Sequence, residues 1–381
     1  MANNTKVQRP NLAYCKENAL NAICPYFTMF PLEYPLNILK KHKNDNSIVL
    51  DPFCGRGTTL FAARNIGLRA WGIDSSPVAV AIAKAKLAIC DTEAPLNLAS
   101  ELITNYEPTN IPDNAFFRAA FHPETLRDVC ALRESLLQLN NDDDATVILR
   151  AAALGCLHGP LPKNINSASY FSNQMPRTYA SKPDYAVRYW KEKGFKAPRV
   201  NILTVLQRKI HRLVGLSKES PNSTAQVLHG DAQLIDTFKT VTSAPSIVIT
   251  SPPYYRMRTY VQDQWLRNWF LGGPDHVTYT TGHQIHQGGK DVFAKSLGLV
   301  WRNIALSSSS NLHMYIRFGS IPSATVNAKK IFRDSLEESG ISWHEVSVRP
   351  AKTAEAGKRQ AGQMKTDSAA AIEYDFHIKR V

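Results

Sequence analysis

Residues 47–59 read Ser47-Ile-Val-Leu-Asp-Pro-Phe-Cys-Gly-Arg-Gly-Thr-Thr59, and this stretch decides the fold. The apolar, β-branched start predicts a buried strand over Ser47–Asp51, and Leu60–Ile66 predicts a helix. Gly55 and Gly57, between the two, allow the backbone to approach a ligand closely. A strand, a glycine-rich turn and a helix in this order form the opening unit of a Rossmann-like fold.

This turn lacks the features of two common phosphate-binding motifs. No lysine followed by serine or threonine comes after Gly57, so the turn is not a P-loop. Leu60 occupies the position of the third glycine in Gly-x-Gly-x-x-Gly, which disfavours a nicotinamide cofactor. The free N–H groups at the start of the helix suit a carboxylate or a phosphate. The turn therefore predicts a different cofactor with an acidic group.

Acidic residues end the next two predicted strands. Arg69–Asp74 ends in an acid about twenty residues after the glycines, where an acid accepts hydrogen bonds from ribose hydroxyls. The alternative role for Asp74 is to cap the helix predicted over Pro77–Cys90, although Ser75 could supply that cap instead. Gln226–Asp231 is the next strand that ends in an acid. The pattern favours an adenosine-containing ligand.

A second motif, Ser251-Pro252-Pro253-Tyr254, follows the strand predicted over Ser246–Thr250. Two consecutive prolines end the strand, because neither donates to a ladder and each restricts its own φ. A hydroxyl, prolyl carbonyls and an aromatic face together suit a planar ring with an exocyclic amine. The alternative is an ordinary Pro-Pro turn. Open α/β sheets bind ligands at the carboxyl ends of their strands, which favours a binding role.

The composition is ordinary for a globular protein, apart from an excess of positive charge. The chain has 381 residues and a formal net charge of +13, with a pI near 9.4, which favours a polyanionic partner. No stretch is apolar for long enough to span a bilayer, and the polar start is no signal peptide. The six cysteines form no Cys-x-x-Cys pair. We expect no metal site, no disulfide framework and a cytoplasmic location.

Residues 91–225 interrupt the α/β alternation. Residues 91–150 hold eleven acids against four arginines, net −7, whereas 151–220 hold twelve Lys or Arg against three acids, net +9. The predicted helices lie near 95–106, 123–139, 145–157 and 199–214. Between the last two, a long loop interleaves aromatic, amide and basic residues, which could neutralise phosphates, stack on bases and read base edges. The alternative is an irregular loop that its aromatics pack onto the helices.

The predicted nucleic-acid-binding residues come from this loop and from the residues after the second motif. They are Tyr170, Asn173, Gln174, Arg177, Tyr179, Lys182, Arg188, Arg256 and Arg258. Alternating elements resume after residue 225. Further helices are predicted over 261–271, 290–306 and 325–339, and further strands over 312–318, 342–349 and 371–379.

The two motifs together resemble the amino-methylating (N4-cytosine/N6-adenine) DNA methyltransferase family. Asp51–Thr59 is similar to its S-adenosylmethionine motif Asp-Pro-Phe-x-Gly-x-Gly-Thr, and Thr250–Tyr254 is similar to its catalytic motif. The serine version with a preceding threonine, Thr-Ser-Pro-Pro-Tyr, is typical of the cytosine-N4-specific enzymes. The aromatic, proline-rich segment Pro25–Pro35 also resembles the one before the cofactor motif of such enzymes. The resemblance covers about 25–90 and 225–320.

The resemblance implies S-adenosyl-L-methionine as the cofactor and no metal. The implied cofactor-binding residues are Asp51, Phe53, Cys54, Gly55, Gly57, Thr58, Asp74, Ser75 and Asp231. Asp74 would take the ribose hydroxyls, Asp231 or the adjacent backbone would meet the adenine amine, and the turn would hold the methionine end. The implied catalytic residues, which would hold the target base, are Ser251, Pro252, Pro253 and Tyr254.

The implied reaction is methylation of an exocyclic amine of a base in DNA. The amine is a poor nucleophile because its lone pair is delocalised, and acceptance of both N–H hydrogens at Ser251 and Pro252 would free that pair. The base would leave the stack and rest on Tyr254. Methylation of cytosine carbon 5 needs a thiolate, usually in a Pro-Cys pair, and this chain has no Pro-Cys dipeptide.

The resemblance implies a Rossmann-like class I methyltransferase fold, a mostly parallel sheet with an antiparallel edge. Residues 1–90 and 226–381 would form the catalytic domain, and 91–225 a mainly helical target-recognition region. A cognate restriction endonuclease is a possible partner. Three alternatives remain open. The first is an adenine-N6 DNA methyltransferase, because the cofactor motif precedes the catalytic motif, as in many of those enzymes. The second is an RNA guanine-N2 methyltransferase, because Asp-Pro-x-Cys-Gly also occurs in that group. The third is a catalytically dead nucleic-acid-binding module, which would keep the same scaffold.

Overall fold

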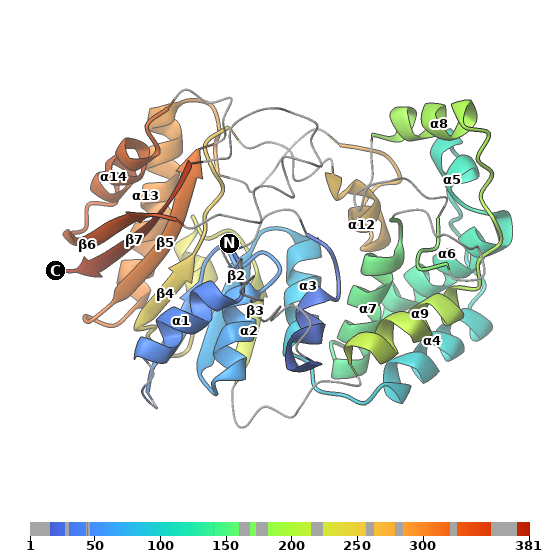
Figure 1. Ribbon diagram of the computed structural model, residues 1–381, viewed down its shortest axis with the longest axis horizontal. Helices are drawn as coiled ribbons and strands as arrows, with labels where there is room; N and C mark the ends of the chain where they lie inside the picture. Colours follow the sequence, from blue (N-terminus) through green and yellow to red (C-terminus); the bar gives the residue numbers. More distant parts are fainter. Residues whose placement is uncertain are drawn as a thin grey trace, which may run out of the picture.

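The computed structural model comprises a twisted sheet covered by helices on one side of the molecule and a layer of helices on the other (Figure 1). It describes residues 16–26, 30–42, 44, 46–139, 141–159, 168–172, 182–214, 224–256, 263–278, 285–320, 326–351 and 372–381. Among the described residues, no helix is long and apolar enough to cross a membrane.

Seven strands form one sheet in the order β3-β2-β1-β4-β5-β7-β6. The strands are β1 (Ile48–Asp51), β2 (Arg69–Asp74), β3 (Ala225–His229), β4 (Ile247–Thr250), β5 (His313–Ser320), β6 (Trp343–Pro350) and β7 (Ile372–Arg380). The first five strands in this order are parallel to one another, and β7 is antiparallel to both β5 and β6. This order, with its antiparallel edge, is the class I methyltransferase fold, so the predicted fold class is confirmed. The strand order reverses between β1 and β4, where such sheets bind ligands.

Both faces of the parallel strands are buried, because their side chains alternate between two hydrophobic clusters. Val49 and Ile247 point into one cluster, and Leu50 and Val248 point into the other. The covering helices are α1 (Glu33–His42), α2 (Thr58–Asn65), α3 (Pro77–Leu87), α10 (Ile235–Phe238), α13 (Lys290–Ser307) and α14 (Ala328–Glu338). A short 3₁₀ helix, η2 (Lys16–Ala22), precedes them.

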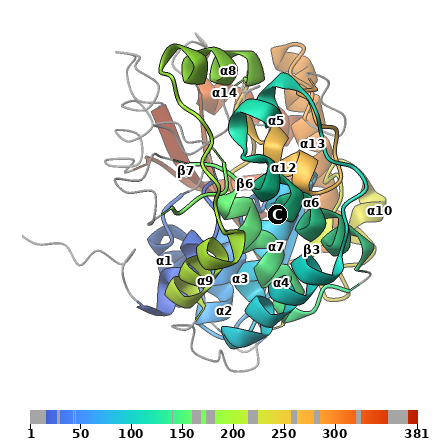
Figure 2. The same cartoon turned by 90° about the vertical axis from the view of Figure 1, so that its right-hand side faces the viewer.

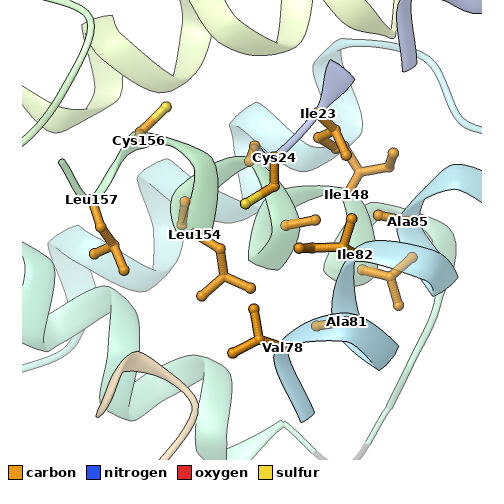
Figure 3. Packing of buried hydrophobic residues seen from close by; sticks show 14 of the residues in the cluster. Ile23, Cys24, Val78, Ala81, Ile82, Ala85, Ile148, Leu154, Cys156 and Leu157 are labelled. Atoms are coloured by element: carbon orange, nitrogen blue, oxygen red, sulfur yellow. The ribbon is translucent and has the colours of Figure 1, made fainter. Parts of the chain in front are cut away.

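The helical layer packs against the sheet through α3. Its helices are α4 (Glu93–Asn105), α5 (Ala115–Ala120), α6 (Pro123–Gln138), α7 (Asp144–Cys156), α8 (Pro183–Glu192) and α9 (Ile202–Leu213). Figure 3 shows Val78 and Ile82 of α3 facing Ile148 and Leu154 of α7. Since these four side chains are buried in one cluster, the sheet and the helical layer share a core.

One helix that follows the second motif also joins the helical layer. Helix α12 (Trp265–Phe270) lies beside α5, α6 and α7 in both views (Figures 1 and 2). The Trp265 ring centroid is 4.7 Å from that of Phe116, and Arg133 Nε donates a 2.7 Å hydrogen bond to the Trp269 carbonyl. Helix α12, the first described helix after β4, therefore belongs to the helical layer.

The main difference from the sequence-based expectation is α8. The segment around Arg188 was predicted to be irregular, and it is a helix. Pro183 stands in the first turn, where a proline needs no N–H partner, and Ala186 and Trp190 are buried one turn apart. Helices α5 and α10 are two short elements that the periodicity did not predict. The other predicted elements agree within a few residues where the structure describes them.

Candidate cofactor and base-binding site

The glycine turn follows β1 and begins helix α2. Gly55 and Gly57 have φ angles of 50° and 72°, in the left-handed region that favours glycine. A Cβ on Gly57 would lie 2.8 Å from Ala83 Cβ, so Gly57 permits close packing of the turn on α3. Within the described part of the chain, the nearest atom that a Cβ on Gly55 would meet is Tyr26 Cε1, at 4.0 Å. The backbone at Gly55 is therefore open to a ligand.

Asp51 is the buried carboxyl group at the end of β1. Its Oδ1 accepts hydrogen bonds from Thr250 Oγ1 at 2.6 Å and from Phe53 N at 3.2 Å. Burial raises the pKa of Asp51 to about 7, although these hydrogen bonds oppose the shift. Thr59 Oγ1 donates to the Ile249 carbonyl at 3.1 Å. Two hydroxyl groups thus join the cofactor motif to the strand that carries the catalytic motif.

Asp74 ends β2 and faces the same turn. Its carboxylate accepts hydrogen bonds from Gly55 N at 2.8 Å and from Ser76 N at 2.9 Å, and burial raises its pKa. The cap of α3 is Ser76, whose side chain accepts from Ala79 N. Ser76 therefore caps this helix, and the alternative role of Asp74 or Ser75 as its cap does not apply. An ionised carboxylate has about four acceptor positions, so Asp74 retains capacity for hydroxyl donors.

The remaining predicted cofactor residues lie around these two carboxyl groups. Asp231 follows β3 and accepts from Gln233 N at 2.9 Å, and the adjacent Gly230 N donates to the Asp74 carbonyl at 3.1 Å. Cys54 is buried and its N–H donates to the Ile73 carbonyl, which anchors the turn to β2. Burial raises the pKa of the Cys54 thiol. Phe53 is partly buried against the second core cluster.

Thr58 starts α2 and supplies a further polar group. Its Oγ1 is buried and has no hydrogen-bond partner among the residues that the structure describes. The N-cap Gly57 provides no side-chain cap, so the first-turn amides of α2 are available as well. An orphaned hydroxyl, uncapped amides, an open Gly55 and a strand-end carboxylate fit the carboxylate and ribose of S-adenosyl-L-methionine.

The Ser-Pro-Pro-Tyr motif continues from β4 at the edge that carries Asp51. Ser251 and Pro253 are partly exposed, whereas Pro252 and Tyr254 are buried. Tyr254 Oη donates a 2.6 Å hydrogen bond to Glu373 Oε1 of β7, and the Phe318 ring meets the Tyr254 ring edge-on at 5.8 Å. Sequence reasoning missed Glu373. No local signal could have found it, because it lies 119 residues after Tyr254.

The predicted nucleic-acid-binding residues fall into three groups. Asn173, Gln174, Arg177, Tyr179 and Arg258 lie outside the described residues. Tyr170 is half-buried and packs over Gly159. Three basic residues are exposed: Lys182 at the N-cap of α8, Arg188 on α8, and Arg256 two residues after the motif, with its guanidinium 5.5 Å from the Tyr255 ring centroid.

The strand order and the glycine turn of this chain are those of the class I methyltransferase fold, whose members use S-adenosyl-L-methionine. Residues 4–85 match the N6/N4 methyltransferase family model, described as DNA methylase. Over 101 residues, the chain is 32% identical to the type II methyltransferase M.MjaII of Methanocaldococcus jannaschii, covering 26% of this chain and 19% of that protein. The chain thus spans less than a fifth of this curated relative's length. These matches confirm the predicted resemblance to the amino-methyltransferases and, with it, the cofactor.

Solved structures are similar only at a low level. The rRNA methyltransferase AviRa of Streptomyces viridochromogenes has 12% sequence identity and a TM-score of 0.39, with 100% of this chain and 96% of that chain covered. A precorrin 8W decarboxylase from Methanobacterium thermoautotrophicum has 8% identity and a TM-score of 0.32, with 93% and 92% covered. The fold assignment rests on the strand order.

Proposed function

We propose that this protein is a site-specific DNA methyltransferase that methylates the exocyclic N4 amine of cytosine, with S-adenosyl-L-methionine as the methyl donor. The observation that carries the proposal is the 2.6 Å hydrogen bond from Thr250 to Asp51. It holds the start of the Ser-Pro-Pro-Tyr motif against the start of the cofactor turn. The methyl donor and the acceptor amine would therefore meet between two adjacent parallel strands, β1 and β4.

The chain's own residues would activate the amine by hydrogen bonding. The Ser251 hydroxyl and the Pro252 carbonyl would accept its two N–H hydrogens, which localises the nitrogen lone pair for attack. The cofactor supplies an electrophilic methyl group on a sulfonium. Tyr254 would stack on the flipped base and offset part of the cost of its leaving the duplex, a few kcal/mol. Orientation and charge complementarity would provide most of the rate enhancement.

Cytosine is the proposed target because residue 251 is a serine. Many adenine-N6 enzymes have an acid at the equivalent position. The serine form of the motif, with its neutral hydroxyl, resembles that of the N4-specific enzymes, which act on the amine of cytosine. Adenine-N6 methylation is the second candidate. Its support is the order of the motifs, since the cofactor turn precedes Ser251 and a helical layer lies between them in the chain.

We further propose that the segment 91–225 recognises DNA, and that the catalytic domain comprises 1–90 and 226–381. Helix α8 carries the supporting surface: Lys182, its N-cap residue, and Arg188, within the helix, are both exposed. The Tyr185 and Tyr189 rings stack with centroids 6.5 Å apart, and Tyr185 is 49% exposed. Cations neutralise phosphates and exposed aromatic rings stack on bases, so this face suits a nucleic acid. A restriction endonuclease of the same specificity would be a cellular partner.

Expression in a host without DNA methylation tests the proposal. The DNA is digested to nucleosides and analysed by mass spectrometry, with the Tyr254→Ala variant as the matched control. N4-methylcytosine that depends on Tyr254 supports the proposal. N6-methyladenine would favour the second candidate, and modified RNA with unmodified DNA would favour an RNA methyltransferase. If neither is modified and calorimetry detects no cofactor binding at millimolar concentration, the protein is not an enzyme of this class.

A further inference from the structure

The base-holding tyrosine of the catalytic motif is fixed by a residue from the far edge of the sheet. Tyr254 Oη donates a 2.6 Å hydrogen bond to Glu373 Oε1, and the Phe318 ring of β5 packs edge-to-face against the Tyr254 ring with centroids 5.8 Å apart. The Tyr254 side chain is only 7% exposed. Its ring is therefore held at two points, one apolar and one polar, which restricts both its depth and its rotation.

The antiparallel insertion of β7 creates this contact. In the β5–β7 ladder, Glu373 lies directly opposite Gly319. Residues opposite each other project to the same face of a sheet, and a glycine places no side chain there. Tyr255, the residue after the motif tyrosine, forms an isolated bridge with Ser320, the neighbour of Gly319. The motif thus passes beside the position at which β5 leaves room for the Glu373 carboxyl group.

The nearby cation Arg317 is paired with another acid, so the Glu373 carboxyl group can accept the hydrogen bond from Tyr254. Arg317, the cation that lowers the pKa of Glu373, makes a two-point ion pair of 2.7 and 2.8 Å with Asp375. Among the described residues, no cation forms an ion pair with Glu373. Burial raises the pKa of Glu373, and the hydrogen bond from Tyr254 opposes that shift. The hydrogen bond from the Tyr254 phenol therefore offsets part of the free-energy cost of burying the Glu373 carboxyl group.

We propose that Glu373 is a positioning residue that orients the Tyr254 ring to receive the target base. The inference rests on the proposed function, since it assigns a second residue to the same site. Because the phenolic proton is donated to Glu373, the hydroxyl anchors the ring, and the ring's face does the stacking. This division of roles explains why a tyrosine, with its hydroxyl, is useful at a position where stacking alone would need only a phenyl ring.

Four variants test the proposal on unmethylated plasmid DNA, with methyl transfer followed at saturating cofactor. Glu373→Leu removes the acceptor and Tyr254→Phe removes the donor, and each should lower kcat/KM for DNA about tenfold. The double variant should also lose about tenfold, because both changes break one bond. Glu373→Gln keeps an acceptor oxygen and should stay within about threefold of the wild type.

Two controls separate positioning from loss of structure. Glu345 is a carboxylate on the neighbouring strand β6 that pairs with Arg333, so Glu345→Leu should leave DNA kinetics unchanged. Cofactor affinity measured by calorimetry should be equal in all variants, because the hydrogen bond of Glu373 is made to Tyr254 at the far edge of the sheet and not to the glycine turn.

Distinct outcomes would overturn the inference. Wild-type kinetics in Glu373→Leu or in Tyr254→Phe would refute it while the proposed function stands. A loss of about a hundredfold in the double variant, the product of two independent effects, would show that Glu373 does not act through Tyr254. A wild-type protein that binds cofactor but transfers no methyl group to DNA would refute both proposals.

Discussion

The Thr250 hydroxyl donates a 2.6 Å hydrogen bond to the carboxyl group of Asp51, which lies 199 residues earlier in the chain. Both residues end neighbouring parallel strands, and both are buried. The bond spans the point at which the strand order reverses, so it joins the two halves of the candidate site. Thr250 therefore has a structural role of its own, because its hydrogen bond holds the Ser-Pro-Pro-Tyr motif beside the cofactor turn.

Loss of this hydroxyl should weaken both stability and cofactor binding. In Thr250→Val the shape is kept, but the buried Asp51 carboxyl loses a donor, and we expect the free energy of unfolding to fall by about 1–3 kcal/mol. Urea denaturation with and without S-adenosyl-L-methionine measures both effects. Thr240→Val, at an exposed threonine that bonds only to a nearby carbonyl, is a suitable control. Equal stability of the two variants would contradict this role of Thr250.

The free energy of unfolding should depend on pH in part through the titration of the Asp51 carboxyl group. Its pKa is about 7 in the folded protein and 3.8 in the unfolded chain, so the folded state binds more protons between these values. Stability from this group is therefore lost as the pH rises from about 4 to 7, and it changes little above that range. Asp51→Asn should flatten this fall, measured by urea denaturation at pH 5 and pH 8. An unchanged slope would mean that Asp51 does not titrate in this range.

The two glycines of the turn should respond differently to the same substitution. Gly57→Ala adds a contact of 2.8 Å with Ala83 to an unfavourable φ, and should cost about 3 kcal/mol of stability. Gly55→Ala meets no atom nearer than Tyr26 Cε1, at 4.0 Å, among the described residues, and should cost about 1 kcal/mol. It should instead lower the affinity for S-adenosyl-L-methionine about tenfold, because the methyl group occupies the open side of the turn. Thermal unfolding and calorimetry separate the two effects, and equal effects at both positions would be unexpected.

Tyr254→Ala should abolish most methyl transfer and leave cofactor affinity nearly unchanged. The Tyr254 side chain contacts Phe318 and Glu373 at the β5–β7 edge of the sheet, so its loss removes stacking for the base. Calorimetry with S-adenosyl-L-methionine and a methyl-transfer assay on plasmid DNA are the measurements. A variant that no longer binds the cofactor would contradict the assignment of Tyr254 to the base.

The exposed cations of α8 should contribute to DNA affinity through phosphate contacts. Replacement of Lys182 and Arg188 by glutamine should weaken binding of all sequences alike and reduce the slope of log K against log salt by about 2. Fluorescence anisotropy at several salt concentrations measures the slope. Lys330→Gln, at an exposed lysine on α14 paired with Asp334, is the control. An unchanged slope in the double variant would remove α8 from the DNA-binding surface.

Local chemistry explains why so much of the fold was predictable. The β-branched run before Asp51, the two glycines of the turn and the double proline after Ser251 each restrict the backbone within a few residues. The segment over Pro183–Glu192 was misjudged for a related reason. Its proline and aromatic residues are typical of loops, yet Pro183 begins the helix and Trp190 is buried against Phe116, a residue far away in the chain.

By itself, the sequence determined the order of the strands along the chain, the glycine turn after β1 and the polar and aromatic groups of the Ser-Pro-Pro-Tyr segment, because these depend on neighbouring residues. The tertiary structure alone decided which distant side chains meet. It brought Thr250 to Asp51, Glu373 to Tyr254 and α12 into the helical layer. Such contacts depend on the strand order and on the packing of whole elements, and no local pattern encodes a partner more than a hundred residues away.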